Sequence, residues 1–210
     1  GGKATGSSSG TVSVDPALAQ RIETVPRFLI IAPSRLAFAS EHTHTDADGR
    51  ECGIALHLML DHLTRHPAVG IDGLYIDIAN RLQRDEDDEE LQAWWREACG
   101  LVTHPDLSFL FDESRYVQAY NEVPVQYLAQ ARMVYGVIDR LVITDDSVLV
   151  IDYKSHRTDN IQQLVVDYRA QLDCYAQAAT RLWPARTVRA GLLFTACAKL
   201  AWMDAIQSRH

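Results

Sequence analysis

The stretch VLVIDYKS, residues 148–155, carries Asp152 and then Lys154 inside an otherwise apolar strand. Lysine is scarce in this chain, which holds 17 arginines and three lysines. The preceding strand, VYGVIDRLVIT, carries Asp139, and a tight turn at Asp145–Asp146 would pair the two strands so that Asp139 faces Asp152 with Cβ atoms about 5 Å apart. Side chains alternate along a strand, so Lys154 is expected on the same face as Asp152. Two carboxylates and an amine are thus predicted to converge within an apolar sheet.

Two opposed carboxylates in such a place need compensation, because like charges repel and burial disfavours the charged form. A hard divalent cation provides it, since Mg²⁺ binds one or two carboxylates and keeps waters that a substrate phosphate can replace. The compact amine of Lys154 can lie against a metal-bound water or a leaving phosphate oxygen, whereas an arginine guanidinium always stays protonated. The alternative is a buried Asp152–Lys154 ion pair, with Asp139 bonded to Arg140 or to a backbone donor. The second aspartate favours the metal site.

The first half of the chain shows helical spacing of apolar residues, from Arg50 to about Phe111. The acidic run RDEDDEE, residues 84–90, is expected to start one of these helices, because carboxylates favour a helix's first turn. In that helix one of Trp94 and Trp95 is expected in the core. The predicted helical segments are GIALHLMLDHL, GLYIDIANRL, DEELQAWWREAC and HPDLSFLF.

From about Tyr116 the periodicity changes to that of strands rich in β-branched residues. Three strands are followed by one long amphipathic helix, residues 161–182, and by two further strand-like segments. The predicted strands are VPVQYLAQ, VYGVIDRLVIT, SVLVIDYKS, TVRAGLLFTA and KLAWMDAI. We therefore predict an α/β fold with a mixed central sheet flanked by helices and a largely helical N-terminal half. Residues 1–12 resemble a tag or linker, and 13–210 are expected to form a single domain.

These segments resemble a known family. G-x-I-D-R-L followed by V-I-D-Y-K-S resembles the restriction-endonuclease-like core of PD-(D/E)XK nucleases, specifically the RecB/AddA-type nuclease domain at the C-terminus of UvrD-like helicase–nucleases. The other landmarks follow in family order: IAPSRLAF resembles an opening S-x-S-x-L segment, GIALHLML an upstream G-x-x-x-H motif, YNEVPV an acidic strand motif, and YRAQLDCYAQAA a downstream Q-x-x-x-Y motif. Ile138 replaces the proline that names the motif, and Ser155 stands where threonine is frequent.

The resemblance implies a metal centre and roles for its neighbours. His57, Asp139 and Asp152 would bind Mg²⁺ or Mn²⁺, together with the backbone carbonyl of Tyr153. Lys154 would orient or activate the attacking water. The helix residues Gln171 and Tyr175 would position the DNA strand or the lysine.

The implied function is a metal-dependent deoxyribonuclease, the exonuclease module of a helicase–nuclease in double-strand-break repair and recombination. Its expected partners are DNA single strands delivered by a helicase, the helicase domains of the same parent chain and a second nuclease subunit. The alternative is a catalytically inactive nuclease-like domain that binds DNA or scaffolds another protein. Because His57, both aspartates and Lys154 are all present, the enzyme is favoured.

Composition limits these interpretations. The net charge of −8 argues against tight DNA binding without assistance. No apolar run of 18 residues occurs, so no membrane span is expected, and the four cysteines lack CxxC spacing, which favours a reduced, cytoplasmic chain. Cys174 and Cys197 do not match the downstream cysteine triplet of relatives with an iron–sulfur cluster, so no cluster is expected.

Single residues keep structural alternatives. A lone histidine between Leu56 and Leu58, such as His57, is often a core residue. Tyr175 could only pack. Glu122, expected in a loop that precedes a strand, could be a salt-bridge partner or could support a second metal.

Overall fold

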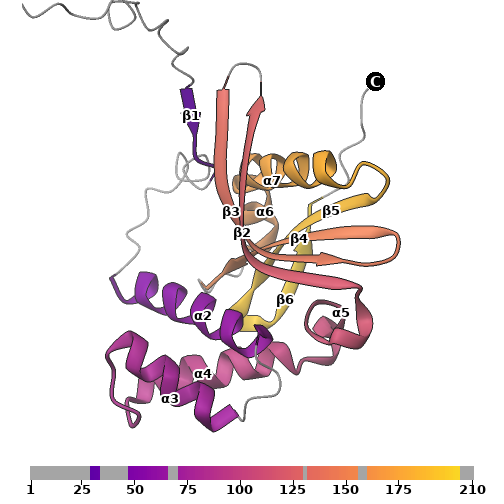
Figure 1. Ribbon diagram of the computed structural model, residues 1–210. Coiled ribbons are helices and arrows are strands. Elements are labelled where there is room, and N and C mark those ends of the chain that lie inside the picture. The colour runs from indigo at the N-terminus through magenta and orange to yellow at the C-terminus, as the bar shows by residue number, and fades with distance from the viewer. Residues whose placement is uncertain (1–28, 34–46, 66–70, 130–131, 156–159, 204–210) are drawn as a thin grey trace, which may run out of the picture.

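The computed structural model describes residues 29–33, 47–65, 71–129, 132–155 and 160–203. A six-stranded mixed sheet forms its centre, with helices on both faces (Figure 1). The predicted opening segment IAPSRLAF lies outside the described residues from Ser34 onward, as do residues 1–12. In chain order the main elements are β1 (Leu29–Ile31), α2 (Ala47–Arg65), α3 (Ile71–Leu82), α4 (Glu89–Val102), α5 (Ser108–Phe111), β2 (Gln118–Ala129), β3 (Arg132–Ile143), β4 (Ser147–Lys154), α6 (Ile161–Asp167), α7 (Arg169–Leu182), β5 (Thr187–Phe194) and β6 (Lys199–Trp202).

Strand β3 organises the sheet because it pairs with three other strands. Antiparallel β2 follows one edge of β3 along its whole length. The other edge is shared: β1 pairs in parallel with residues 132–134, and β4 pairs antiparallel with residues 140–143. The rest of the sheet is β4 and β5 in parallel and β5 and β6 antiparallel. A stretch of β3 that ends at Asp139 therefore has no strand partner on the second edge within the described part of the chain.

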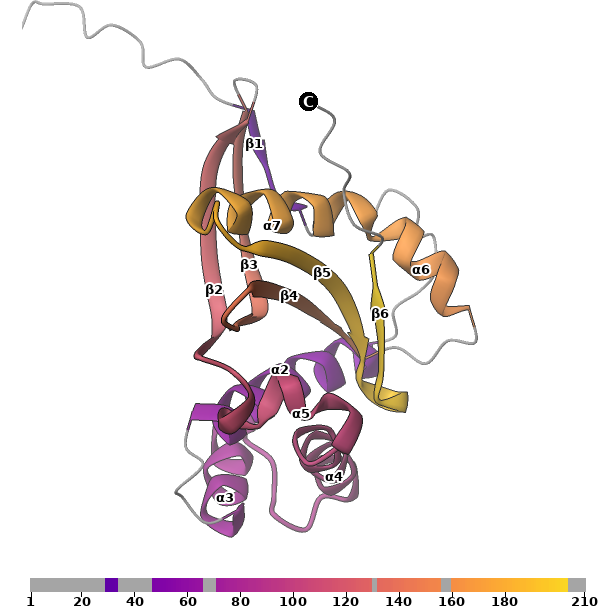
Figure 2. The same cartoon turned by 90° about the vertical axis from the view of Figure 1, so that its right-hand side faces the viewer.

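Two apolar layers cover the two faces of the sheet (Figure 2). Helices α2 to α5 pack on one face, against side chains such as Leu149 and Ile151 of β4. Helices α6 and α7 pack on the other face, against Val148 and Val150 of the same strand. A strand that is buried on both faces is apolar at nearly every position. Asp152, a buried charged residue within β4, is an exception to this pattern.

The acidic run does begin a helix, as the sequence predicted. Asp88 is the N-cap of α4, and its carboxylate accepts hydrogen bonds from the backbone N–H groups of Glu90 and Leu91 at 2.9 and 3.1 Å. Trp95 is buried in the core, whereas the ring of Trp94 lies 4.6 Å beneath the guanidinium of Arg84. One tryptophan of the pair is thus a core residue.

The single long helix predicted over residues 161–182 is wrong, because the chain forms two helices that meet at Tyr168. Tyr168 has φ −89° and ψ 1°, and its N–H closes α6 by bonding to the carbonyl of Leu164 at 2.9 Å. The residues before the break are Val165, Val166 and Asp167, all weak helix formers. The apolar stripe nevertheless continues across the break into the second layer. Among the described residues, no helix is both long and apolar enough to cross a membrane.

Candidate metal and catalytic centre

The polar side chains singled out in the sequence meet where β3 and β4 diverge. Helix α2 brings His57 to this point from one side of the sheet, and α7 brings Gln171 from the other. The strands contribute Glu122 from β2, Asp139 from β3, and Asp152 and Lys154 from β4.

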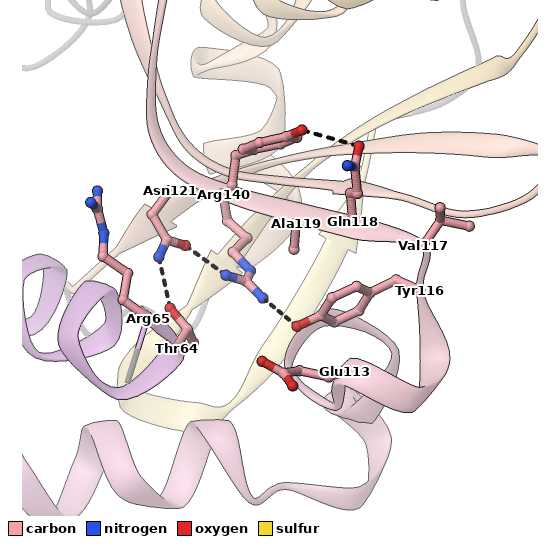
Figure 3. Close-up of a pocket in the computed structure, with 10 residues that line it drawn as sticks. Thr64, Arg65, Glu113, Tyr116, Val117, Gln118, Ala119, Asn121 and Arg140 are labelled. Atoms are coloured by element: carbon pink, nitrogen blue, oxygen red, sulfur yellow. Dashed lines mark hydrogen bonds between the residues drawn. The ribbon is translucent and has the colours of Figure 1, made fainter. Parts of the chain in front are cut away.

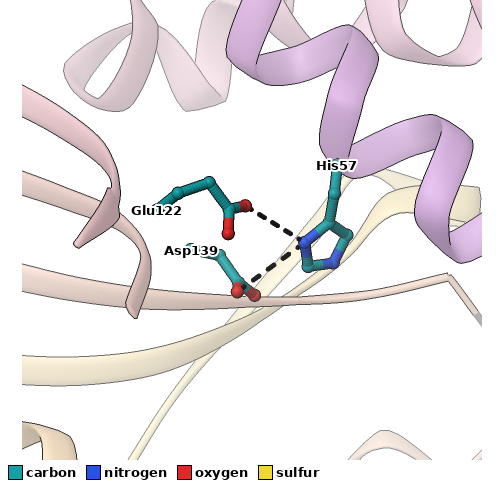
Figure 4. Close-up of side chains that lie close together, drawn as sticks. All are labelled: His57, Glu122 and Asp139. Atoms are coloured by element: carbon teal, nitrogen blue, oxygen red, sulfur yellow. Dashed lines mark ion pairs between the residues drawn. The ribbon is translucent and has the colours of Figure 1, made fainter. Parts of the chain in front are cut away.

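His57, Glu122 and Asp139 form a compact cluster (Figure 4). The Nδ1 atom of His57 lies 3.5 Å from Oε1 of Glu122 and 3.7 Å from Oδ1 of Asp139. One ligand atom from each of the three residues lies within 4.8 Å of the others. An imidazole and two carboxylates at this spacing could together hold a divalent metal ion.

Glu122 lies inside β2, so the expectation of a loop at this position is wrong. Its neighbours Asn121 and Val123 pair with Arg140 and Ile138 of β3, which places Glu122 beside Asp139. Its φ of 48° lies in the left-handed region, which non-glycine residues seldom adopt. This local change of backbone direction interrupts a regular strand and accompanies the approach of the carboxylate to His57.

The predicted register of the β3–β4 hairpin is confirmed by the pairs from Arg140–Ile151 to Ile143–Val148. The backbone pairing ends at Arg140–Ile151, so Asp139 and Asp152 lie just beyond the last pair. The carboxylate of Asp139 turns toward β4 and accepts a hydrogen bond from the backbone N–H of Tyr153 at 2.6 Å. A side chain thus continues the connection between the strands after the backbone ladder has stopped.

Asp152 lies beside Lys154, as alternation along the strand predicted. Its Oδ2 atom is 2.7 Å from Nζ of Lys154, and its Oδ1 atom accepts a hydrogen bond from Nε2 of Gln171 at 2.8 Å. Asp152 is 3% exposed, so the two contacts hold a buried carboxylate in one orientation. Both parts of the alternative offered by the sequence are therefore present: a buried Asp152–Lys154 ion pair, and Asp139 bonded to a backbone donor. They lie next to the histidine–carboxylate cluster, so the alternative and a metal site do not exclude each other.

Burial and crowding of negative charge perturb this centre. Burial, assisted by the charge of Asp152, raises the pKa of Asp139 to about 7. Burial alone would lower the pKa of His57, but the carboxylates of Asp139 and Glu122 outweigh it and raise this pKa to about 9. The charge of Asp152 thus disfavours ionisation of Asp139, and a cation held beside Asp139 would relieve this repulsion. The residues present therefore fit a divalent metal ion.

Gln171 and Tyr175 lie one helical turn apart on α7. Nε2 of Gln171 lies 3.4 Å from the hydroxyl oxygen of Tyr175 and also donates to Asp152. The ring of Tyr175 packs against Gly136 of β3, where a Cβ atom would lie only 2.7 Å from Cε1 of the ring. Gln171 therefore touches the centre directly, whereas Tyr175 reaches it through Gln171.

Tyr153 takes part with its backbone and its ring. The ring lies on the α2 side of the sheet, edge-on to His57 with centroids 5.4 Å apart. The structure places Asp152 beside Lys154 and Gln171. The side chains whose ligand atoms lie within 4.8 Å of one another are His57, Glu122 and Asp139, so Asp152, predicted as a metal ligand, lies outside this cluster. Glu122 was left open by the sequence and is the third member of the cluster.

A cavity of about 680 Å³ lies between the end of α2 and the start of β2 (Figure 3). Its wall includes Arg140, whose guanidinium donates to the carbonyl of Leu110 and to the side chain of Asn121. Asn121 in turn donates to the hydroxyl of Thr64 on α2. This network connects α2, α5 and β3 through Asn121, the residue that directly precedes Glu122 in β2. It holds the histidine helix against the strand that carries Asp139.

Known proteins with similar sequences identify the family of this chain. Residues 33–202 match the PD-(D/E)XK nuclease superfamily. An ATP-dependent helicase/nuclease protein of Lacticaseibacillus paracasei is 28% identical over 195 residues, which cover 81% of this chain and 14% of that protein. The protein of the same name from Ligilactobacillus salivarius is 41% identical over 49 residues, which cover 23% of this chain and 4% of that protein. The chain thus spans a small part of the curated relatives it matches. With a match over most of its length, the chain belongs to the PD-(D/E)XK nuclease superfamily.

Proposed function

We propose that this chain is a divalent-metal-dependent deoxyribonuclease that hydrolyses phosphodiester bonds. The observation that carries the proposal is the cluster of His57, Glu122 and Asp139 beside the buried Asp152–Lys154 pair. Carboxylates and an imidazole can hold a cation, and a cation together with an amine suits phosphoryl chemistry, because negative charge has to be neutralised on both the phosphate and the leaving oxygen.

His57, Asp139 and Asp152 would hold Mg²⁺ or Mn²⁺ together with the backbone carbonyl of Tyr153, and Glu122 is placed to join them or to support His57. When bound, the metal would polarise the phosphate and lower the pKa of a water molecule.

The remaining groups orient this centre. Gln171 fixes one oxygen of Asp152 through its amide, so the other oxygen remains directed at Lys154. The ammonium of Lys154 would hold the attacking water in line with the phosphorus or stabilise the charge that develops on the phosphate. Tyr175 would keep Gln171 in place, which makes it a positioning residue.

The chain would act as the exonuclease module of a helicase–nuclease in double-strand-break repair and recombination, in the cytoplasm. Support comes from its resemblance to relatives named as ATP-dependent helicase/nuclease proteins, of which it spans 14% in the longer match. A net charge of −8 weakens unaided attraction to DNA. Helicase domains of a longer protein that contains this chain, and a second nuclease subunit, would therefore deliver the single strand.

The test is digestion of a fluorescent oligonucleotide, single- or double-stranded, with Mg²⁺ or Mn²⁺ and with EDTA as a blank. Asp152→Asn and Lys154→Ala should each reduce cutting by at least about 10³-fold. Asp145→Asn is the matched control, because it neutralises an exposed aspartate in the turn of the same hairpin and should cut like the parent chain.

Calorimetric titration with Mn²⁺ completes the experiment, since the isolated chain lacks a helicase to deliver DNA. Cutting that depends on metal and on Asp152 supports the proposal. Failure to cut with every metal, combined with failure to bind Mn²⁺, overturns it in favour of an inactive, scaffolding domain. The proposal is also overturned if the unmutated chain binds metal but does not cut when it is tested together with its helicase domains.

A further inference from the structure

We infer that Tyr168 is a positioning residue of the centre, whose ring face holds the ammonium of Lys154 in place. This inference rests on the proposed function for its kinetic consequence, but its structural part stands alone. Nζ of Lys154 lies 3.8 Å from the centroid of the Tyr168 ring, well within the range of a cation–π contact. The same Nζ lies 2.7 Å from Oδ2 of Asp152.

Two contacts restrain the amine more than either one would alone. A lysine side chain has a flexible four-carbon stem, and a single ion pair leaves its ammonium free to move about the carboxylate. The aromatic face gives the ammonium a second contact in addition to Asp152. The side chain of Lys154 is 14% exposed, so little solvent competes for its remaining hydrogen-bond donors. The remaining donors can then point toward a water or a phosphate.

Tyr168 is well suited to be a rigid support. It is 5% exposed and packs within the apolar layer between the sheet and α6–α7. It also occupies the junction of the two helices, where its N–H bonds to the carbonyl of Leu164 and its carbonyl accepts from the N–H of Leu172. The break in the helix thus coincides with the residue whose ring faces the lysine.

A purely apolar role for Tyr168 and the positioning role proposed above predict different results for its variants. An apolar role requires only volume, so leucine would serve almost as well after a loss of stability. The positioning role requires a π face but not a hydroxyl group. Tyr168→Phe should therefore behave like the parent chain, and Tyr168→Leu should not.

The first readout is steady-state cleavage of a single-stranded oligonucleotide with Mn²⁺. Tyr168→Leu should lower kcat about tenfold, which corresponds to about 1.4 kcal/mol, with KM within about twofold of the parent. The matched control is Tyr127→Leu: Tyr127 packs in the same layer, and its ring lies 4.4 Å from the guanidinium carbon of Arg181. This control should lower thermal stability while leaving kcat unchanged.

The second readout does not need activity. Lysine labelled with ¹³C at the ε-carbon gives three signals in this chain, from Lys3, Lys154 and Lys199, and Lys154→Arg identifies the one that matters. The ε-methylene protons of Lys154 should be shifted upfield by the ring in the parent chain and in Tyr168→Phe. The shift should disappear in Tyr168→Leu and persist in Tyr127→Leu.

The outcomes separate this inference from the proposed function. A parent chain that shows the ring shift but never cuts overturns the nuclease proposal and leaves the placement of the lysine intact. A parent chain without the shift overturns the inference whether or not it cuts. Equal kcat values for Tyr168→Leu and Tyr127→Leu, or an equal fall in Tyr168→Phe, also overturn it.

Discussion

The carboxylate of Asp139 accepts a 2.6 Å hydrogen bond from the backbone N–H of Tyr153, at the point where the ladder between β3 and β4 ends. A side chain of one strand thus replaces a backbone partner of the next, and the strands can separate without leaving a buried N–H unpaired. The same side chain lies 3.7 Å from His57 on the other side. Asp139 therefore links the frame of the sheet to the candidate metal centre.

The first prediction concerns metal binding by Asp139. Mn²⁺ at 100 times its Kd should stabilise the parent chain by about 2.7 kcal/mol, because it binds the folded state and not the unfolded one. Asp139→Asn removes a ligand and should abolish this gain, while Asp145→Asn should keep it. Thermal melting with and without Mn²⁺ measures the effect. An unchanged gain in Asp139→Asn would exclude Asp139 as a ligand.

The second prediction concerns the backbone at Glu122. Its φ of 48° strains a residue with a Cβ atom, so Glu122→Gly should be more stable than Glu122→Gln by about 1 kcal/mol in EDTA. Both variants should bind Mn²⁺ more weakly than the parent, because both lack the carboxylate. Urea denaturation and calorimetric titration give the two quantities.

Gln83 offers a matched control for Glu122. It also has a positive φ, 55°, but it lies at the end of α3, away from the centre. Gln83→Gly should stabilise the chain similarly and leave Mn²⁺ affinity unchanged. If Glu122→Gly keeps full Mn²⁺ affinity, Glu122 is not part of the metal site.

The third prediction concerns the buried guanidinium of Arg140, which is 2% exposed. It donates twice to the carbonyl of Leu110, at 3.2 and 2.7 Å, and once to Asn121 at 2.7 Å. Arg140→Met leaves these buried acceptors unpaired and should lower the free energy of unfolding by about 3 kcal/mol. Arg65→Met, in the wall of the same cavity, removes an exposed ion pair to Asp61 and should cost about 0.5 kcal/mol or less. Equal losses in the two variants would contradict a structural role for Arg140.

The fourth prediction concerns the close approach of Gly136 and Tyr175. A Cβ atom at position 136 would lie 2.7 Å from Cε1 of the ring, so Gly136→Ala should destabilise the chain by about 2 kcal/mol. Tyr175→Leu removes the obstructing ring, and in that background Gly136→Ala should cost much less. A double-mutant cycle in urea measures this coupling, and additive effects would show that the ring does not limit position 136.

The sequence determined the properties that depend on neighbouring residues along the chain. Alternation in β4 places Asp152 and Lys154 on one face, and the short turn at Asp145–Asp146 sets the register that brings Asp139 opposite β4. Helical periodicity likewise predicted α2, α4 and the apolar stripe of α6 and α7. These features follow from the fixed periods of strands and helices, which can be read from the sequence without knowledge of distant contacts.

Tertiary structure alone decided which distant groups join that hairpin. The approach of His57 depends on how α2 packs on the sheet, and the approach of Glu122 depends on a positive φ inside β2 that no local pattern announces. The break at Tyr168 likewise turns a residue of the apolar stripe into the neighbour of Lys154. Such placements come from the packing of whole elements against one another, in which the burial of many side chains outweighs the preference of any single residue.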